Sequence, residues 1–319
     1  MSILTTKVLP TDADVRNAIS EYLGNEPFSL ERFSTGLCHY VYDVTPQAQQ
    51  PFVLRMGCEE TRDNLIGSVY WTGMLSPLKI PIPKILYKNF SGQFPYTILE
   101  RIRGTDLGNV YTFLTPSQKQ FIAEEIVHWQ SEVRKLPAAK GYGFGFTYED
   151  RRLKSSWVEV IEDQITRARE WIVTHAICNV THVDRVEDAL ASHKAYLMSV
   201  QAKPFLHDTT TKNVIISEGK LSGIVDIDDL CFGDSLFVVA LTYMALLSRE
   251  YETDYIKFWC NKLKLSNEQR KIMNFYTAIF CVTFMGEIGQ KFNKDIVEVD
   301  LNQVKRLENI LDMLLKEEG

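Results

Sequence analysis

Three polar residues between positions 203 and 237 have the types and the order that phosphoryl transfer requires. Asn213 follows Asp208 by five residues, and Asp226 comes after two short apolar segments. An amide oxygen and a carboxylate suit Mg²⁺, which takes oxygen ligands and usually shares them with phosphates. A carboxylate just before them can orient an attacking hydroxyl and accept its proton. This set predicts phosphoryl transfer, with Asp208 as the base and with Asn213 and Asp226 as metal ligands.

The apolar segments between these residues explain how the two metal ligands could meet. Residues 214–216 and 221–225 predict two short strands, and the Glu-Gly pair at 218–219 predicts a tight turn between them. A hairpin brings the residue before its first strand and the residue after its second strand to the same end. We therefore expect Asn213 and Asp226 to lie side by side.

The same order of residues resembles the aminoglycoside phosphotransferase and choline kinase-like family. The family pattern is His-Gly-Asp-x-x-x-x-Asn, then Ile-Asp-x-x-Asp, then Gly-Asp-Pro. Here Asp208-Thr-Thr-Thr-Lys-Asn213 matches the first element, Gly223-Ile-Val-Asp226 the second and Gly233-Asp234 the third. The resemblance covers roughly residues 28–250. Three positions depart from the pattern, namely Leu206 for His, His207 for Gly and Ser235 for Pro.

The resemblance implies an α+β, bilobal, protein-kinase-like fold. Residues 1–100 would form a small antiparallel-sheet lobe that binds the nucleotide. Residues 101–319 would form a larger, mainly helical lobe that holds the catalytic residues and the acceptor. The donor would be ATP, with GTP as an alternative, bound together with Mg²⁺.

The resemblance also assigns residues near the amino terminus to the nucleotide. A loop with one glycine, between two predicted strands, would lay backbone N–H groups over the phosphates, which assigns Ser34 and Gly36. Arg55 stands where the fold places its phosphate-contacting lysine, and a guanidinium binds phosphate bidentately. Backbone groups of the inter-lobe segment would meet the adenine, which assigns Glu100 and Ile102. An ordinary hairpin turn, a solvated arginine and a plain strand exit are the alternatives.

A predicted helix over residues 60–75 begins beside several acids. In the kinase fold this helix supplies the carboxylate that pairs with the strand cation, here Arg55. Glu59, Glu60 and Asp63 are the candidates, and the sequence does not choose between them.

Helix signals fill the rest of the chain. Capping boxes at Thr115 and Ser266 predict two helix starts, and apolar spacing predicts further helices over residues 157–172, 183–200, 236–247 and 301–315. The helix after Thr115 is expected to bury an apolar face made of Phe121, Ile122, Ile126 and Trp129. Residues 141–146, rich in glycine and aromatic residues, predict a loop near the cleft.

The short span between Asp226 and the next helix bears on the acceptor. A protein kinase carries a long activation segment there, so the cleft of this chain is expected to accept a small molecule. Asp229 is interpreted as a metal neighbour or a substrate contact, and Asp234 as a helix-capping acid. Glu287 is interpreted as a surface acid in preference to a cleft residue.

Composition excludes some classes of partner. The chain has 319 residues and a formal net charge of −6, which argues against nucleic-acid binding and is compatible with cationic substrates. Six scattered cysteines without a metal-ligand spacing predict free thiols in a reducing compartment. No signal peptide and no apolar run of membrane-spanning length are evident. These features predict a cytoplasmic protein without a membrane partner.

The sequence therefore predicts a kinase that transfers the γ-phosphate of ATP or GTP to a hydroxyl of a small acceptor. Aminoglycoside-like, choline-like and sugar-like acceptors, cationic ones included, fit equally. One alternative is a degenerate nucleotide-binding module without turnover, which Leu206, the single-glycine loop and Arg55 would suit. The other is a protein kinase, which the short span after Asp226 disfavours.

Overall fold

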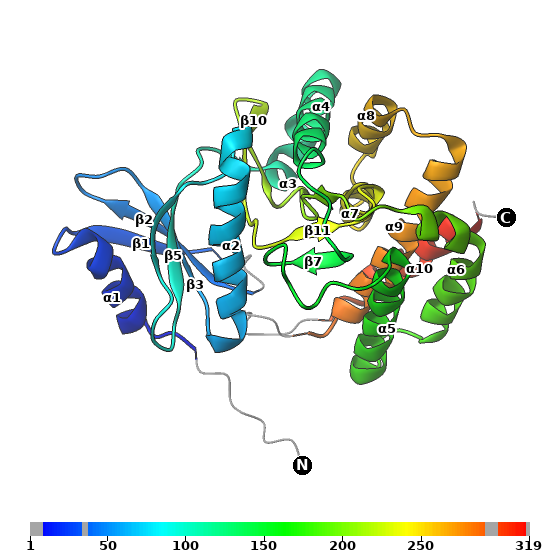
Figure 1. Cartoon of the computed structure of the whole chain (residues 1–319), viewed down its shortest axis with the longest axis horizontal. Coiled ribbons are helices and arrows are strands. Elements are labelled where there is room, and N and C mark those ends of the chain that lie inside the picture. Colours follow the sequence, from blue (N-terminus) through cyan, green and yellow to red (C-terminus); the bar gives the residue numbers. More distant parts are fainter. Residues whose placement is uncertain (1–8, 34–37, 291–298, 317–319) are drawn as a thin grey trace, which may run out of the picture.

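A five-stranded antiparallel sheet forms the amino-terminal part of the molecule (Figure 1). The computed structural model describes residues 9–33, 38–290 and 299–316. In sheet order the strands are β1 (Phe28–Arg32), β2 (Tyr40–Pro46), β3 (Phe52–Met56), β5 (Tyr96–Glu100) and β4 (Ile85–Asn89). Their apolar side chains and those of α1 (Asp12–Leu23) build a small core of their own.

Helix α1 is fixed at its start and along its length. Thr11 and Asp14 form a capping box that satisfies the first backbone N–H groups. Glu21 accepts hydrogen bonds from the hydroxyls of Tyr87 and Tyr96 on the sheet, at 2.7 and 2.6 Å. These bonds hold α1 against the sheet strands.

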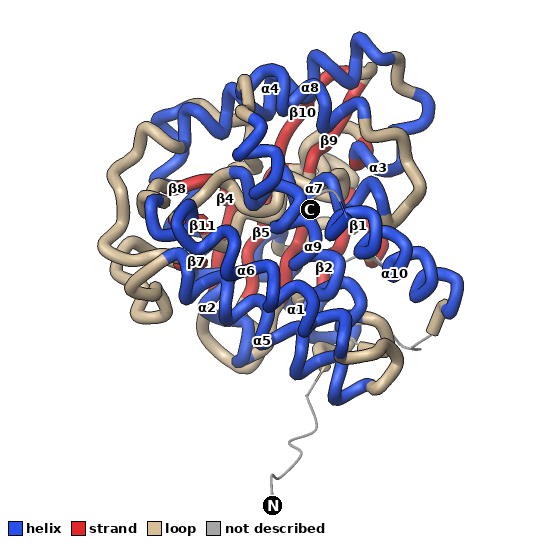
Figure 2. Tube along the Cα trace, turned by 90° about the vertical axis from the view of Figure 1, so that its right-hand side faces the viewer, coloured by secondary structure: helices blue, strands red, loops and turns tan. Residues whose placement is uncertain are grey.

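A larger, mainly helical part follows the sheet. Its long helices are α4 (Pro116–Val133), α5 (Trp157–His175), α6 (Thr181–Ser199), α7 (Leu236–Leu247), α8 (Asp254–Leu263), α9 (Asn267–Glu287) and α10 (Leu301–Lys316). Helix α9 is buried along most of its length and packs against α5, α7 and α10. Figure 2 shows the helices grouped around the short strands of this part. The arrangement confirms the predicted α+β fold.

Helix α2 (Arg62–Leu75) connects the sheet to the helical part (Figure 1). Trp71 and Leu75 belong to the larger core, and Trp71 Nε1 donates a hydrogen bond to Gly145 O at 2.8 Å. A Cβ at Gly67 would lie 2.3 Å from Asp228 O, so glycine is needed for this approach. Because the larger core recruits residues from before position 100, the division at that residue stays a prediction.

Six short strands of the helical part form two small sheets near the site. They are β6 (Thr105–Asp106), β7 (Gly143–Gly145), β8 (Pro204–Phe205), β9 (Val214–Ser217), β10 (Lys220–Ile224) and β11 (Leu230–Phe232). Strands β9 and β10 form the predicted antiparallel hairpin. Glu218 and Gly219 both have positive φ, 51° and 74°, as a two-residue hairpin turn of type I′ requires.

Most predicted elements are confirmed, including the capping boxes at Thr115 and Ser266. Three details differ. Phe121 is 50% exposed, so it does not belong to the buried face of α4. The segment predicted as a loop at 141–146 contains strand β7, which pairs with β11. Helix α8 was not predicted. Among the described residues, no helix is both long and apolar enough to span a membrane.

Candidate active site

The β9–β10 hairpin brings the two predicted metal ligands together. Val225 N donates a hydrogen bond to Asn213 O at 2.9 Å, which places Asn213 next to the residue before Asp226. Asn213 Nδ2 donates to Asp208 O at 3.2 Å, so the catalytic loop is tied to the hairpin. All three residues of the predicted set therefore converge.

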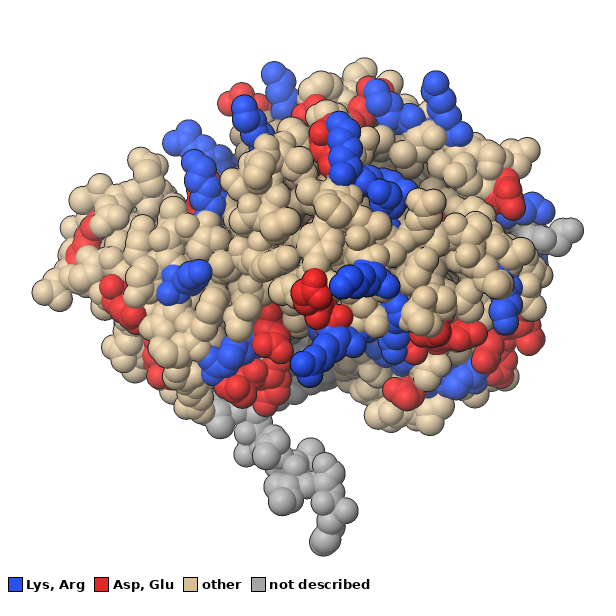
Figure 3. Space-filling model, viewed as in Figure 1, with Lys and Arg blue, Asp and Glu red and all other residues tan. Residues whose placement is uncertain are grey.

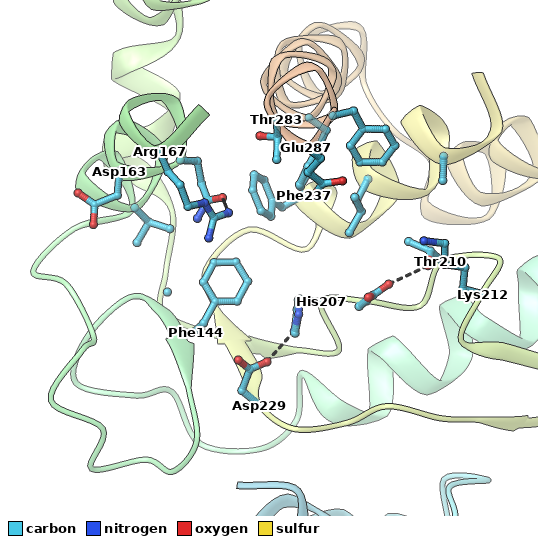
Figure 4. A pocket seen from close by; sticks show the side chains of 18 of the residues that line it. Phe144, Asp163, Arg167, His207, Thr210, Lys212, Asp229, Phe237, Thr283 and Glu287 are labelled. Atoms are coloured by element: carbon cyan, nitrogen blue, oxygen red, sulfur yellow. Dashed lines mark hydrogen bonds and ion pairs between the residues drawn. The ribbon is translucent and has the colours of Figure 1, made fainter. Parts of the chain in front are cut away.

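Asp208 faces a large cavity of about 1380 Å³. The hydroxyl of Thr210 donates to Asp208 Oδ1 at 2.8 Å and fixes the carboxylate (Figure 4). Phe144 of β7 and Phe237 of α7 also line this cavity. Glu287, at the end of α9, lines it too, so the interpretation of Glu287 as a surface acid is wrong.

Arg55 on β3 makes its ion pairs with the loop that follows β10. Its guanidinium lies 2.6 Å from Asp226 and 2.8 Å from Asp228, and its side chain is only 6% exposed. Burial opposes the charge, but the two carboxylates outweigh it and raise the pKa of Arg55. Glu59, one of the three candidate partners, pairs with Arg62 instead. The loop after β10 thus supplies carboxylates that the sequence analysis sought at the start of α2.

His39 completes a chain of four charged or polar groups. His39 Nε2 lies 2.9 Å from Asp228 Oδ2. Although burial opposes the shift, Arg55 and His39 hold the pKa of Asp228 below its usual range. We name the set of His39, Asp228, Arg55 and Asp226 the Arg55 network. It joins β3 and the residue just before β2 to the predicted metal ligand, Asp226.

A second ion pair lies beside the predicted base. His207 Nδ1 is 3.0 Å from Asp229 Oδ1, and the His207 side chain is 25% exposed. Burial would lower the pKa of His207, but Asp229 outweighs it and raises the pKa to about 9. At neutral pH a cationic imidazole therefore stands next to Asp208.

This pair predicts a pH dependence of stability. The pKa of His207 rises from 6.5 in the unfolded chain to about 9, so the contribution is complete below pH 6.5 and is lost as pH rises through 9. By linkage it amounts to at most about 3 kcal/mol. In urea unfolding, Asp229→Asn should destabilise the protein below pH 6.5 and have little effect above pH 9. An equal effect at both ends would contradict the assignment.

Asp234 has the structural role predicted for it. Its Oδ1 accepts a hydrogen bond from Leu236 N at 3.0 Å, at the start of α7. Its Oδ2 accepts from the hydroxyls of Tyr196 and Tyr276, at 3.0 and 3.2 Å. Burial outweighs these bonds and raises the pKa of Asp234. The carboxylate therefore anchors α7 from within the core.

The predicted nucleotide residues are only partly described. Ser34 and Gly36 lie outside the described residues. Glu100 ends β5, and its backbone N–H donates to Lys84 O at 2.9 Å, so this amide is already engaged in the sheet. Ile102 follows two residues later and packs closely over Gly223 of β10. The adenine contacts assigned to Glu100 and Ile102 stay a prediction.

The donor set at the hairpin end suits a hard cation. Asn213 uses its amide nitrogen toward Asp208 O, which leaves its side-chain oxygen for other contacts. The Asp226 side chain is 53% exposed. Within the described ranges, no cluster of three or more His, Cys, Asp or Glu side chains could hold a metal ion. A site with two protein oxygens and further ligands from phosphates and water fits Mg²⁺ better than a metal held by the protein alone.

The sequence did not predict the roles of His39 and Asp228 or the place of Arg167 at the cavity. His39 directly precedes β2, and nothing near it in the sequence indicates a pairing with Asp228. Asp228 carried a signal, because it lies two residues after Asp226 in an acidic run. Arg167 lies on α5 with its side chain at the cavity wall, and nothing local distinguishes it from Arg169, the other arginine of that helix.

A small antiparallel sheet before a helical part, with Asp208, Asn213 and Asp226 converging beside a large cavity, defines a phosphotransferase of the protein-kinase-like class. Residues 29–264 match the sequence model of the Phosphotransferase enzyme family. The chain belongs to this family and is a phosphotransferase that acts on hydroxyl groups. A search of curated proteins gives no match.

Several solved structures with the same fold are aminoglycoside phosphotransferases. APH(4)-Ia is 16% identical and has a TM-score of 0.69, with 97% of this chain and 100% of that chain covered. ADP-bound APH(2'')-Ib is 12% identical, with a TM-score of 0.65 and coverage of 97% and 99%. The GDP complex of aminoglycoside 2'-phosphotransferase-IIIa is 13% identical, with a TM-score of 0.67 and coverage of 97% and 100%. At these identities the likeness establishes the fold.

Proposed function

We propose that this protein transfers the γ-phosphate of ATP or GTP to a hydroxyl of a small molecule. The observation that carries the proposal is the convergence of Asp208, Asn213 and Asp226 beside a cavity of about 1380 Å³. This volume exceeds the range of about 300–1,000 Å³ that is usual for small-molecule sites, so the cavity can hold an acceptor together with part of the donor. The family assignment supports phosphoryl transfer to a hydroxyl as the reaction.

Each converging residue has a distinct role in this proposal. Asp208, held by Thr210, orients the acceptor hydroxyl and accepts its proton. Asn213 and Asp226 hold Mg²⁺ through an amide oxygen and a carboxylate oxygen. When bound, Mg²⁺ neutralises the charge of the phosphates. The rate then depends mainly on positioning and on electrostatic stabilisation.

Solved relatives of the fold support a nucleotide as donor. Variants of APH(4)-Ia were solved with ADP or AMP-PNP together with hygromycin B, and the 2'-phosphotransferase-IIIa with GDP. In our proposal Arg55 contacts the phosphates. Its guanidinium lies 2.6 Å from Asp226, so a phosphate bridged to the metal at Asp226 would come within its reach.

A thermal-shift titration tests this proposal. A ligand that binds only the folded state raises Tm by mass action, by an amount that grows with its concentration over Kd. We expect ATP or GTP to raise Tm in the presence of Mg²⁺ and to do so less in EDTA. A Mg²⁺-dependent shift without phosphoryl transfer to any hydroxyl would favour the degenerate nucleotide-binding module. No shift with either nucleotide would contradict the proposed donor site.

A further inference from the structure

The cavity beside Asp208 is lined by six Lys and Arg residues and five Asp and Glu residues, although the whole chain is acidic. Its basic residues are Arg151, Arg152, Lys154, Arg167, Lys212 and Arg249. Its acidic residues are Asp163, Asp208, Asp229, Glu287 and Asp300. Figure 3 shows Lys and Arg side chains interspersed with Asp and Glu side chains in the middle of one face. The local charge, and not the net charge of −6, acts on a bound acceptor.

The acids of the cavity are already engaged; Asp300, for example, accepts a hydrogen bond from Asn302 N at 2.8 Å. Asp163 lies 2.6 Å from Lys154 Nζ, and Asp229 lies 3.0 Å from His207. Asp208 accepts from Thr210 and is the base of the proposed reaction. A polycationic acceptor needs several carboxylates that are free to pair with it, because each unpaired buried charge is costly. The cavity offers few of them.

Arg167 is the basic residue placed to contact an acceptor. Its guanidinium donates to Gln164 Oε1 and lies 5.1 Å from the centre of the Trp171 ring. Within the described part of the chain, no carboxylate lies at ion-pair distance from it. By contrast, Arg152 pairs with Asp150 at 2.6 Å. Arg167 is thus held in position by neutral groups. Burial lowers its pKa, and Glu287 and Asp163 oppose that shift from beyond ion-pair distance, so neither acid occupies the guanidinium fork.

Arg167 and the proposed catalytic residue Asp208 lie on opposite sides of the cavity. In Figure 4, Arg167 projects from α5 on one side, and Thr210 and Lys212 lie on the other side. The rings of Phe144 and Phe237 lie between them. Thr210 is bonded to Asp208. The cavity therefore has a hydroxyl-activating end, an apolar middle and an end formed by Arg167, with Asp163 on the same side (Figure 4).

On the proposed kinase function, we propose that the acceptor is a hydroxylated compound with an anionic group, and that Arg167 binds this group. A guanidinium presents a planar fork of N–H donors, which matches a carboxylate or a phosphate bidentately. With the anionic group at Arg167, the carbon skeleton lies over Phe144 and Phe237, and the hydroxyl reaches Asp208. Lys212 and Arg249 give no information about the charge of the acceptor, because cations near the reacting end can also bind the phosphates of the donor.

The test uses acceptors that share a skeleton and differ in charge. Gluconate, glucose and glucosamine form one trio, and glycerate, glycerol and serinol form a shorter one. Binding of each compound is measured by calorimetry, with and without saturating Mg²⁺ and AMP-PNP. We expect the anion of at least one trio to bind at least about tenfold more tightly than its cation, which corresponds to about 1.4 kcal/mol.

Two arginines of α5 provide a matched pair of variants. Arg167→Gln should remove most of the preference for the anion and leave the binding of the neutral compound unchanged. Arg169→Gln should keep the preference, because Arg169 pairs with Asp184 and Glu187 and does not line the cavity. Both variants lose one positive charge from the same helix, so a general charge effect would appear in both.

Several outcomes overturn the inference. They are tighter binding of the cation, equal binding within both trios, absence of binding by both anions, or an unchanged preference in Arg167→Gln. Nucleotide binding is measured in the same samples, so that a failure of the anionic-acceptor proposal can be told apart from a failure of the kinase proposal. If Mg²⁺ and AMP-PNP bind but the cation is preferred, the kinase proposal stands and the anionic acceptor falls. If the nucleotide does not bind, the kinase proposal falls, and the charge preference is still measured without it.

Discussion

Phosphoryl transfer by the Asp208→Asn variant is expected to be about 10²–10⁴ times slower than that of the unchanged protein, the range for loss of a general base. Asparagine keeps the shape of the side chain and can still accept from Thr210, so the fold should persist. It cannot take the proton of the acceptor hydroxyl. Transfer of radiolabelled phosphate from ATP to the best hydroxyl acceptor, followed in a single turnover, measures the effect.

The control for this variant is Asp184→Asn, the same chemical change at a surface ion pair on α6. It should leave the transfer rate unchanged. The circular dichroism spectrum and Tm of Asp208→Asn should match those of the unchanged protein. Retention of more than about a tenth of the rate by a folded Asp208→Asn protein would be incompatible with its role as base.

Asp226→Asn is expected to cost about 10³-fold or more in the rate of transfer, the upper end for loss of one preorganised electrostatic contact. The substitution removes the only carboxylate of the proposed Mg²⁺ pair and leaves the amide of Asn213. Arg55 keeps Asp228 as a partner at 2.8 Å, so the buried guanidinium does not lose all its neutralising charge. The rate should be measured against Mg²⁺ concentration.

The dependence on Mg²⁺ separates a metal ligand from a structural residue. For a ligand, half-maximal rate should require a higher Mg²⁺ concentration in Asp226→Asn, and the Mg²⁺-dependent part of the nucleotide Tm shift should shrink. A merely structural role would lower the Tm of the protein without ligands and leave the Mg²⁺ requirement unchanged. That second pattern would remove Asp226 from the metal site.

Local signals explain which parts of the site were predictable from the sequence. The Glu218–Gly219 turn and its apolar flanks specify the hairpin, and the hairpin alone determines that Asn213 and Asp226 meet. The capping box at Thr115 likewise specifies the start of α4 within a few residues. In these cases the residues that interact are close in sequence, so their spacing carries the geometry.

The remaining parts depend on contacts between distant segments. Arg55 and Asp228 are 173 positions apart, and only the packing of β3 against the loop after β10 brings them together. The same holds for Glu287, whose place at the cavity follows from the position of α9 between α5 and α7. Periodicity also failed at Phe121, because a helix face of four apolar residues was wider than the surface that covers it. Such features need the tertiary structure.

The Arg55 network bears on the order in which the metal and the donor arrive. The guanidinium of Arg55 lies 2.6 Å from Asp226, the proposed ligand of the metal. A free divalent cation would have to displace this guanidinium from Asp226. Nucleotide phosphates offer Arg55 substitute anions, so the metal and the nucleotide should bind cooperatively. Titration of Mg²⁺ with and without AMP-PNP measures this coupling, and equal affinities would refute it. If the coupling is found, Arg55 serves as a built-in counter-ion: it disfavours binding of a free cation at Asp226 and favours binding of Mg²⁺ as its nucleotide complex.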